Sequence, residues 1–177
     1  MAARREALTP ECRRDWSAAL SGHLIAALPA HRLGIVGHCW PIRNEPDLAV
    51  ALDHWRARGS LTALPVVVAP GEPLAFRTWS PGESLVPDRY GIPTPAAGVE
   101  CQPTLVLLPL NAFDADGYRL GYGGGFFDRT LATLDPRPLA VGVGFECNRV
   151  ASIRPQAHDQ RLDWIVTEAG AWRVSPG

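Results

Sequence analysis

The sequence predicts one α/β domain spanning residues 1–177, with a mainly parallel sheet between helical layers. Three observations support this fold class. Segments with strand patterns alternate with segments of helical spacing along the whole chain, which is typical of βαβ units. The clearest strand candidate, residues 105–108, is a continuous apolar run, as expected of a strand buried on both faces. A length of 177 residues suits a single domain with a full core.

Two helices are predicted in the first third of the chain. The motif Thr9-Pro10-Glu11 marks a helix start, with a capping hydroxyl, a proline at the first helical position and an acid near the positive end. This helix should extend to about Leu28, because Pro29 ends it. A second helix is expected over residues 47–58, closed by Gly59. Their buried faces are predicted to carry Trp16, Leu20, Leu24 and Ala27 in the first helix, and Leu48, Ala51, Leu52 and Trp55 in the second.

The remaining elements are mostly strands. We expect them over residues 33–37, 64–69, 74–79, 105–108, 139–145 and 164–167. Residues 81–98 are rich in Pro and Gly and predict an ordered loop lying across the site rather than a linker.

A glycine loop follows the strand at residues 105–108. The segment Arg119-Leu120-Gly121-Tyr122-Gly123-Gly124-Gly125 leads into a helical segment that begins with Phe126. A helix start after glycines presents main-chain N–H groups to an anion, and glycines let the anion approach closely. Arg119 and Arg129 flank the loop and could clamp phosphate oxygens, while Asp128 could bind the Mg²⁺ of a polyphosphate. The alternative is a simple tight turn, since the spacing fits neither the dinucleotide fingerprint nor the Walker loop.

The absence of Lys from the composition excludes several classes of enzyme. All 17 basic residues are Arg, and the absence of Lys excludes Schiff-base enzymes, pyridoxal-phosphate enzymes and Walker-type ATPases. Any phosphate must then be held by Arg and by the main chain. A bias toward Arg codons would explain the missing Lys equally well.

Charge and cysteines indicate the setting. A net charge of -1 gives no sign of a nucleic-acid or membrane partner. Four scattered cysteines without a C-x-x-C pair argue against a zinc site or a disulfide framework. With no apolar signal core at its N-terminus, the chain is expected to be a soluble, cytoplasmic monomer that binds small molecules.

The segment NAFDADGYRLGYGGGFFDRTL, residues 111–131, resembles the signature of the 5-formyltetrahydrofolate cyclo-ligase family. Further pieces of the family pattern occur in order at residues 40–47, 64–67, 91–95, 158–159 and 162–168. The resemblance covers nearly the whole chain and implies a three-layer α/β/α, Rossmann-like fold.

The resemblance also implies an activity. It indicates the conversion of 5-formyltetrahydrofolate and MgATP into 5,10-methenyltetrahydrofolate, ADP and phosphate. The formyl oxygen would attack the γ-phosphate, and folate N10 would then close the ring as phosphate leaves. No protein nucleophile is required, so catalysis would depend on positioning and charge neutralisation.

Site residues follow from the same resemblance, position by position. Those implied for ATP are Arg119, Leu120, Gly121, Tyr122, Gly123, Gly124, Gly125, Phe126 and Phe127. Those implied for the folate are Trp40, Glu45, Tyr122, Gly123, Gly124, Gly125 and Phe126. Asp128 and Asp159 would hold Mg²⁺, and the residues expected to act in catalysis are Arg119, Tyr122 and Asp128.

Each of these roles has a plainer alternative. Glu45 could be a charge near the start of the next helix, Asp128 an early-helix charge and Asp159 the acceptor of an Asx turn.

At the position of Trp40, a flat apolar face suits a planar ring, and the loop lies beyond the carboxyl end of a strand, where ligands bind in open α/β sheets. His38 and Cys39 are not expected to form a nucleophile pair, because neighbours on a strand point to opposite faces.

The sequence departs from the family pattern at three places. The family begins with a basic segment that contacts ATP phosphate, and this segment is missing here; Arg4 and Arg5 lie too late relative to the first helix to replace it. Thr94 replaces a common acidic residue, and Asn148 stands where Gln is usual. The first departure supports an alternative, a folate-binding homologue with weak or no turnover. A sugar-phosphate isomerase or CoA-transferase relative of similar fold, needing a carboxylate base and no ATP, is the other alternative.

Overall fold

An eight-stranded sheet forms the centre of the molecule, as the computed structural model shows for residues 2–29 and 34–175. Its strand order is β12-β11-β10-β7-β1-β2-β3-β6. The strands are β1 (Ile35–Gly37), β2 (Leu61–Val67), β3 (Leu74–Thr78), β6 (Glu100–Cys101), β7 (Leu105–Pro109), β10 (Leu139–Val143), β11 (Trp164–Thr167) and β12 (Gly170–Arg173). The five strands from β11 to β2 are parallel. At one side β12 pairs antiparallel with β11, and at the other β3 pairs antiparallel with both β2 and β6. The predicted mainly parallel α/β sheet is therefore confirmed.

The strand order changes direction at β1. The chain leaves β1 to form β2 on one side, and it later returns to form β7 on the other side. In open α/β sheets a change of strand order of this kind is where ligands bind, at the carboxyl ends of the strands.

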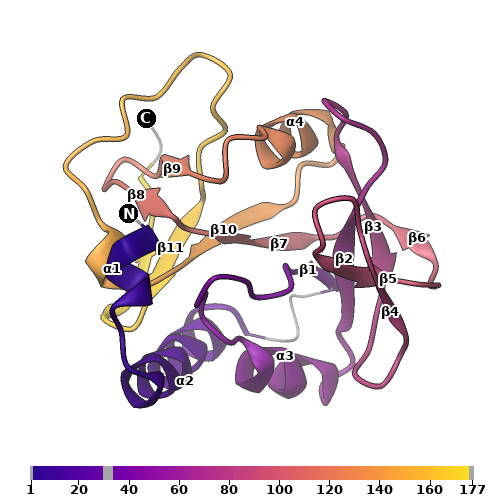
Figure 1. Ribbon diagram of the computed structural model, residues 1–177, viewed down its shortest axis with the longest axis horizontal. Coiled ribbons are helices and arrows are strands. Elements are labelled where there is room, and N and C mark those ends of the chain that lie inside the picture. Colours follow the sequence, from indigo (N-terminus) through magenta and orange to yellow (C-terminus); the bar gives the residue numbers. More distant parts are fainter. Residues whose placement is uncertain (1, 30–33, 176–177) are drawn as a thin grey trace.

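Helices cover both faces of the sheet (Figure 1). The helices α2 (Pro10–Ala27) and α3 (Ala49–Arg56) lie on one face, and α4 (Phe126–Thr133) lies on the other. Each face has its own core, formed by alternate residues of the same strands: Leu105 and Leu107 of β7 face α2 and α3, whereas Val106 and Leu108 face the side of α4. This division follows from the two-residue period of a strand.

The helix ends and buried faces follow the sequence pattern. The Thr9 hydroxyl accepts a hydrogen bond from the Cys12 main-chain N–H (3.2 Å), and Pro10 is the first helical residue, as predicted. Leu20 and Leu24 are fully buried, whereas Trp16 and Ala27 of the predicted apolar face are only partly so. In α3 all four predicted core residues are buried. None of the helices in residues 2–29 and 34–175 is long and apolar enough to cross a membrane.

Several boundaries differ from the predicted ones. Strand β2 begins at Leu61 rather than at residue 64, and the first half of the predicted strand 33–37 lies partly outside the described residues. The ordered loop expected over residues 81–98 contains a hairpin of β4 (Leu85–Pro87) and β5 (Pro93–Pro95). The elements that were not predicted are α1 (Ala2–Glu6), β6, β8 (Ala112–Phe113), β9 (Arg119–Leu120), the 3₁₀ turn η2 (Glu146–Asn148) and β12. All of these elements have at most five residues, too few to show a period.

Trp55 provides a test of the core between α2 and α3. Its side chain is fully buried, and its indole N–H donates to the main-chain oxygen of Leu28 (3.1 Å). We expect Trp55→Ala to lower the free energy of unfolding by about 3–5 kcal/mol, because it leaves a cavity and an unpaired carbonyl. Val50→Ala on the exposed side of the same helix should change it by less than about 0.5 kcal/mol. Urea unfolding of both variants is the measurement, and equal losses would contradict this assignment of the two faces.

Candidate active site

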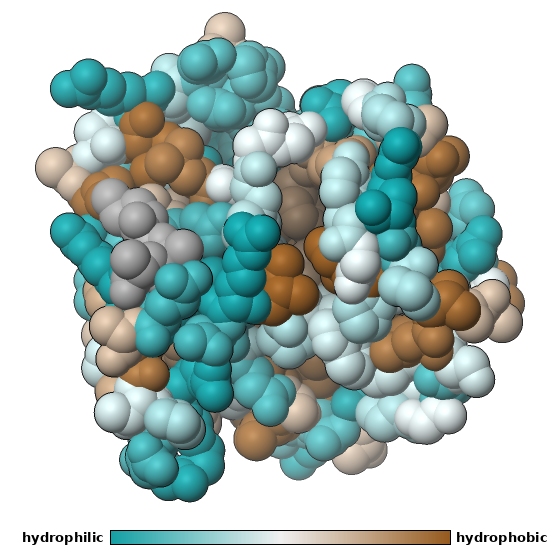
Figure 2. Space-filling view, viewed as in Figure 1, coloured by the Kyte–Doolittle hydropathy of each residue, from teal (hydrophilic) through white to brown (hydrophobic). Residues whose placement is uncertain are grey.

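Four segments meet beyond the carboxyl ends of β1 and β7. They are the loop after β1 (residues 38–45), the segment from β8 to α4 (residues 112–126), the loop at residues 156–160 and the short helix α1. The hairpin of β8 and β9 carries the chain from β7 to the glycine loop, which crosses to α4 (Figure 1). On the face seen in Figure 2, hydrophobic side chains are exposed at the centre and hydrophilic ones gather toward the left.

The glycine loop is exposed and its main-chain donors are free. Gly121, Tyr122, Gly123 and Gly124 are exposed, and in the part of the chain that the structure describes no acceptor is bonded to the N–H groups of residues 121–125. Gly123 (φ 86°) and Gly125 (φ 61°) have left-handed conformations, which glycine adopts without strain. Gly125 is the residue that caps α4. This arrangement presents amide donors and the positive end of a helix to solvent, which suits an anion.

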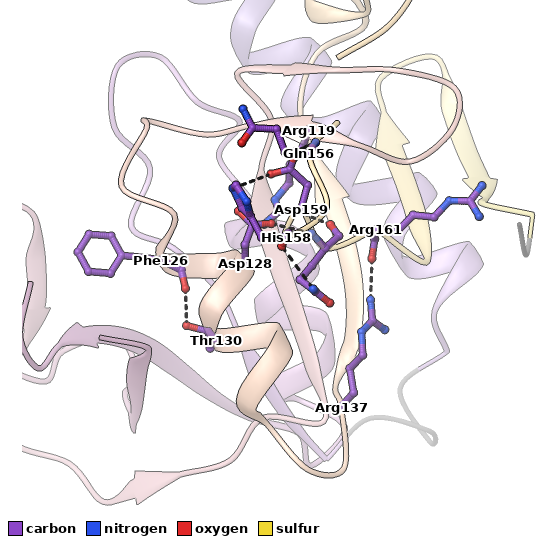
Figure 3. A network of polar contacts seen from close by, with 10 residues as sticks. Arg119, Phe126, Asp128, Thr130, Arg137, Gln156, His158, Asp159 and Arg161 are labelled. Atoms are coloured by element: carbon purple, nitrogen blue, oxygen red, sulfur yellow. Dashed lines mark hydrogen bonds and ion pairs between the residues drawn. The ribbon is translucent and has the colours of Figure 1, made fainter. Parts of the chain in front are cut away.

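Asp128 lies in the first turn of α4 and is held by two groups (Figure 3). Its Oδ1 accepts a hydrogen bond from Arg119 Nη2 (3.0 Å) and another from the main-chain N–H of Gln160 (2.9 Å). Arg119 also donates from Nη1 to the main-chain oxygen of Gln160 (2.7 Å). The Arg119 side chain is only 5% exposed, and burial lowers its pKa, opposed by the charges of Asp128 and Asp159. Arg119 therefore joins α4 to the loop at residues 156–160.

Asp159 lies near Asp128, because the next residue in the chain, Gln160, is hydrogen-bonded to Asp128. Asp159 Oδ2 accepts a hydrogen bond from the Gln156 main-chain N–H (2.7 Å), so it does close the turn that the plainer interpretation expected. The side chain is nevertheless partly exposed, and it lies close enough to Arg119 to act on its pKa. The structure thus brings together the two carboxylates predicted for Mg²⁺, which the sequence separates by 31 positions.

The residues present fit a magnesium ion that is shared with phosphate. Within residues 2–29 and 34–175 no group of three or more His, Cys, Asp or Glu side chains could hold a metal by itself. Mg²⁺ in nucleotide sites is held by one or two carboxylates together with phosphate oxygens and waters. Asp128 and Asp159 supply the two carboxylates, and the neighbouring glycine loop is where a phosphate would lie.

Arg129 supports the glycine loop from behind. Its Nη2 donates to the main-chain oxygen of Gly124 (2.7 Å), and its guanidinium lies over the Phe126 ring, 5.2 Å from the centroid. Turning this carbonyl toward Arg129 leaves the N–H side of the loop facing outward. Both arginines predicted to clamp phosphate, Arg119 and Arg129, thus make protein contacts in this structure.

Glu45 and Tyr122 form the second half of the site. The Tyr122 hydroxyl donates to Glu45 Oε1 (2.6 Å), and the Ile42 main-chain N–H donates to Oε2 (3.0 Å). Burial raises the pKa of Glu45, whereas these two hydrogen bonds and the nearby Arg charges lower it. Burial and the carboxylate raise the pKa of Tyr122 to about 12, so its hydroxyl stays a donor. The glycine loop is thereby joined to the loop after β1. That the two loops share a folate pocket, as the resemblance implies, stays a prediction.

Aromatic rings line the same loop. Trp40 is partly exposed and packs edge-on against Trp79, with ring centroids 5.7 Å apart. His38 also lies near Trp79, with ring centroids 6.3 Å apart, and burial lowers its pKa to about 4. Burial raises the pKa of the Cys39 thiol, so the thiol is not activated as a nucleophile. His38 and Cys39 follow β1 and do not lie in it, so the strand argument made from the sequence does not apply to them. Trp79 was not predicted as a site residue, because it lies at the end of an ordinary strand pattern.

Arg5 lies beside the glycine loop, although it was not predicted as a site residue. The short helix α1 places its guanidinium where it donates to the Tyr122 hydroxyl (3.1 Å). That Arg4 and Arg5 do not replace the phosphate-contacting segment of the family stays a prediction. The Arg5 side chain has no exposed surface, and it lies 4.0 Å from Glu45. The sequence contains no signal for this placement, since neither spacing nor charge distinguishes Arg5 from Arg4.

The hairpin of β4 and β5 reaches the start of α4. Tyr90 in its loop packs edge-on against Phe126, with ring centroids 6.0 Å apart. Residues 81–98 therefore contact the start of α4 at Tyr90, and that they lie across the site stays a prediction.

Two cavities accompany the sheet. A small one of about 20 Å³ lies under Glu45, between Cys39, Leu107 and Pro109. A larger one of about 510 Å³ lies at the opposite edge, beside Leu105 and Leu139 at the amino ends of β7 and β10. The glycine loop lines neither cavity, since it is exposed on the surface.

Comparisons with known proteins point to one family. A model of the 5-formyltetrahydrofolate cyclo-ligase family matches residues 1–168. The chain is 30% identical over 178 residues to a 5-formyltetrahydrofolate cyclo-ligase of Escherichia coli (strain K12), covering 96% of this chain and 97% of the relative. It is 30% identical over 136 residues to one of Mycolicibacterium smegmatis, covering 72% and 70%.

Solved structures agree with this match. The chain is similar to the NMR structure of Aquifex aeolicus 5,10-methenyltetrahydrofolate synthetase, with a TM-score of 0.82, 28% identity, and coverage of 99% and 90% of the two chains. It is also similar to a 5,10-methenyltetrahydrofolate synthetase of Mycoplasma pneumoniae, with a TM-score of 0.78, 20% identity, and coverage of 94% and 93%. The second likeness bears on the fold alone.

The buried ring of His38 gives a pH dependence to test. A histidine whose pKa falls from 6.5 to about 4 on folding binds fewer protons in the native state, so stability is lost as pH falls from the unfolded pKa toward the folded one. Between about pH 7 and pH 5, wild type should lose about 2 kcal/mol more stability than His38→Gln. Urea unfolding at both pH values measures this, and equal losses in the two proteins would contradict it.

Proposed function

The chain belongs to the 5-formyltetrahydrofolate cyclo-ligase family, and from this premise we propose how its site carries out that ligase reaction. The proposed reaction converts 5-formyltetrahydrofolate and ATP into 5,10-methenyltetrahydrofolate, ADP and phosphate. The observation that carries the proposal is the juxtaposition, through Tyr122, of an exposed glycine loop and a buried carboxylate at Glu45. The loop suits a polyphosphate, and the carboxylate suits the N–H groups of a pterin.

The folate is proposed to bind between the loop after β1 and the glycine loop. Each oxygen of Glu45 accepts one hydrogen bond from the protein and keeps a further lone pair for the N–H groups of the pterin. Trp40, set edge-on against Trp79, is proposed to offer its partly exposed face to the ring. Residues 122–126 would line the other side, next to the bound nucleotide.

ATP is proposed to bind with its phosphates along residues 119–127. The free N–H groups of residues 121–125 and the amino end of α4 would bind phosphate oxygens, as required in a chain without Lys. Asp128 and Asp159 would hold Mg²⁺, which supplies charge neutralisation to the polyphosphate when it is bound. The role of Arg119 is then to orient Asp128 and the Gln160 main chain, because it is too buried to extend into solvent.

The chemistry needs orientation more than it needs a reactive side chain. The formyl oxygen forms a bond to the γ-phosphorus while the bond to ADP breaks. N10 then bonds to the formyl carbon, and phosphate departs with the formyl oxygen as N10 loses its proton. The raised pKa values of Cys39 and Tyr122 fit a site without a protein nucleophile. Holding the formyl oxygen, the γ-phosphorus and N10 in line would supply most of the rate acceleration.

Asp128 provides the test of this function. Wild type mixed with 5-formyltetrahydrofolate and MgATP should develop the methenyl absorbance, and Asp128→Asn should lower kcat at least about 100-fold, because a metal ligand and the charge facing Arg119 are both lost. Asp116→Asn, in the exposed turn between β8 and β9, is the matched control and should retain wild-type kcat.

Two outcomes would contradict the proposal. Folate bound by wild type without formation of product would favour the binding homologue over the ligase. Neither binding nor product would reopen the isomerase or CoA-transferase interpretation. Thermal unfolding of Asp128→Asn shows whether a loss of kcat reflects the site or the stability of the whole chain.

A further inference from the structure

Arg5 is the most completely buried charge near the site. Its side chain has no exposed surface, although it belongs to a five-residue helix at the start of the chain. All three guanidinium nitrogens donate: Nε to the Arg43 main-chain oxygen (2.8 Å), Nη1 to Asn111 Oδ1 (3.2 Å) and Nη2 to the Tyr122 hydroxyl (3.1 Å). A buried guanidinium is tolerated only where its donors are satisfied in this way.

Two hydrogen bonds connect Arg5 to Glu45 through the Tyr122 hydroxyl, and the donor in each is determined. A guanidinium can only donate, so the Tyr122 oxygen must accept from Arg5. Its single proton is then free for Glu45 Oε1, which lies 2.6 Å away. The carboxylate is also 4.0 Å from the Arg5 guanidinium, which favours its ionised state against the effect of burial. Arg5 thus determines which way the Tyr122 hydroxyl points and supports the charge that Glu45 presents.

The partners of Arg5 come from both loops of the site. Arg43 and Glu45 belong to the loop after β1, whereas Asn111 and Tyr122 belong to the segment after β7. One side chain therefore ties together the two loops that diverge at the change of strand order. The ring of Tyr122 is held from another direction as well, since the Arg43 guanidinium lies 5.1 Å from its centroid.

We propose that Arg5 is a positioning residue for the folate half of the site: it holds the Tyr122 hydroxyl and the Glu45 carboxylate in the orientation that binds the pterin. This inference rests on the proposed function. A direct role as a phosphate ligand does not fit, because Arg5 has no exposed surface and its nitrogens are engaged by the protein. Arg4, on the same short helix, is exposed and donates to the Cys147 main-chain oxygen (3.1 Å), away from Tyr122 and Glu45, so it is the matched control.

The test compares Arg5→Met with Arg4→Met in the full chain. Binding of 5-formyltetrahydrofolate and of MgATP is measured separately by equilibrium dialysis, together with the KM for each substrate. Arg5→Met should weaken folate binding about tenfold, the effect of losing a charge-assisted hydrogen bond, and should change ATP binding less than about twofold. Arg4→Met should change both less than about twofold.

A double-mutant cycle distinguishes positioning from general support. If Arg5 acts through Tyr122, then Arg5→Met should weaken folate binding less than about threefold in a Tyr122→Phe background, because the hydroxyl it orients is already gone. If Arg5→Met does not fold, Arg5→Lys serves instead, since one ammonium cannot replace a fork of donors to three acceptors. The same selective loss of folate binding is expected of it.

Three results would overturn the inference. Weaker ATP binding with unchanged folate binding would make Arg5 a phosphate ligand. Equal weakening of both ligands, with a lower melting temperature, would make its role purely structural. Unchanged binding of both folate and ATP would show that Arg5 has no role in the site. Failure of the proposed function gives a different result: the wild-type protein binds folate but forms no methenyl product. In that case the comparison of folate binding by the variants still decides the role of Arg5.

Discussion

The parallel pairing of β1 with both β2 and β7 is the constraint on which the site depends. This pairing makes the chain diverge at the carboxyl ends of β1 and β7, the place where ligands bind in open α/β sheets. The apolar residues of β7 face alternate cores, so the strand is held from both sides and its end is fixed. Glu45 and Tyr122 lie in the segments that follow these two strands and are hydrogen-bonded to each other. The loop at residues 156–160 is attached through the hydrogen bond from Gln160 to Asp128.

Electrostatics divides the site into two parts that share Tyr122. On one side, free amides and a helix start form a positive surface beside two carboxylates, Asp128 and Asp159. On the other side, a buried carboxylate at Glu45 is neutralised by Arg5 and by hydrogen bonds. The proposed reaction, which transfers a phosphoryl group from ATP to the formyl oxygen on an uncharged pterin, would use this pairing of an anion site with a hydrogen-bonding pocket. Since the chain has no Lys, positive charge in both parts comes from guanidinium groups and main-chain dipoles.

Much of the fold and part of the site could be predicted from local sequence. The cap at Thr9, the core face of α3 and the apolar run of β7 depend on neighbours within a few residues, and all three are confirmed. The proximity of Asp128 to Asp159 could be expected only through the family resemblance, because no local pattern relates them. The two-residue strands β8 and β9 escaped prediction because their pairing depends on a partner elsewhere in the chain and not on their own residues.

By itself the sequence determined where most helices and core strands form and that a glycine loop precedes α4. These features are set by periodicity, capping and the conformational freedom of glycine, which act over short distances. Only the tertiary structure decided that Arg119 holds Asp128 and that Arg5 is buried against Tyr122 and Glu45. The physical reason is that arginine is mostly exposed in proteins, so a sequence alone predicts an exposed charge. An arginine can be buried only where the folded chain places enough hydrogen-bond acceptors around it.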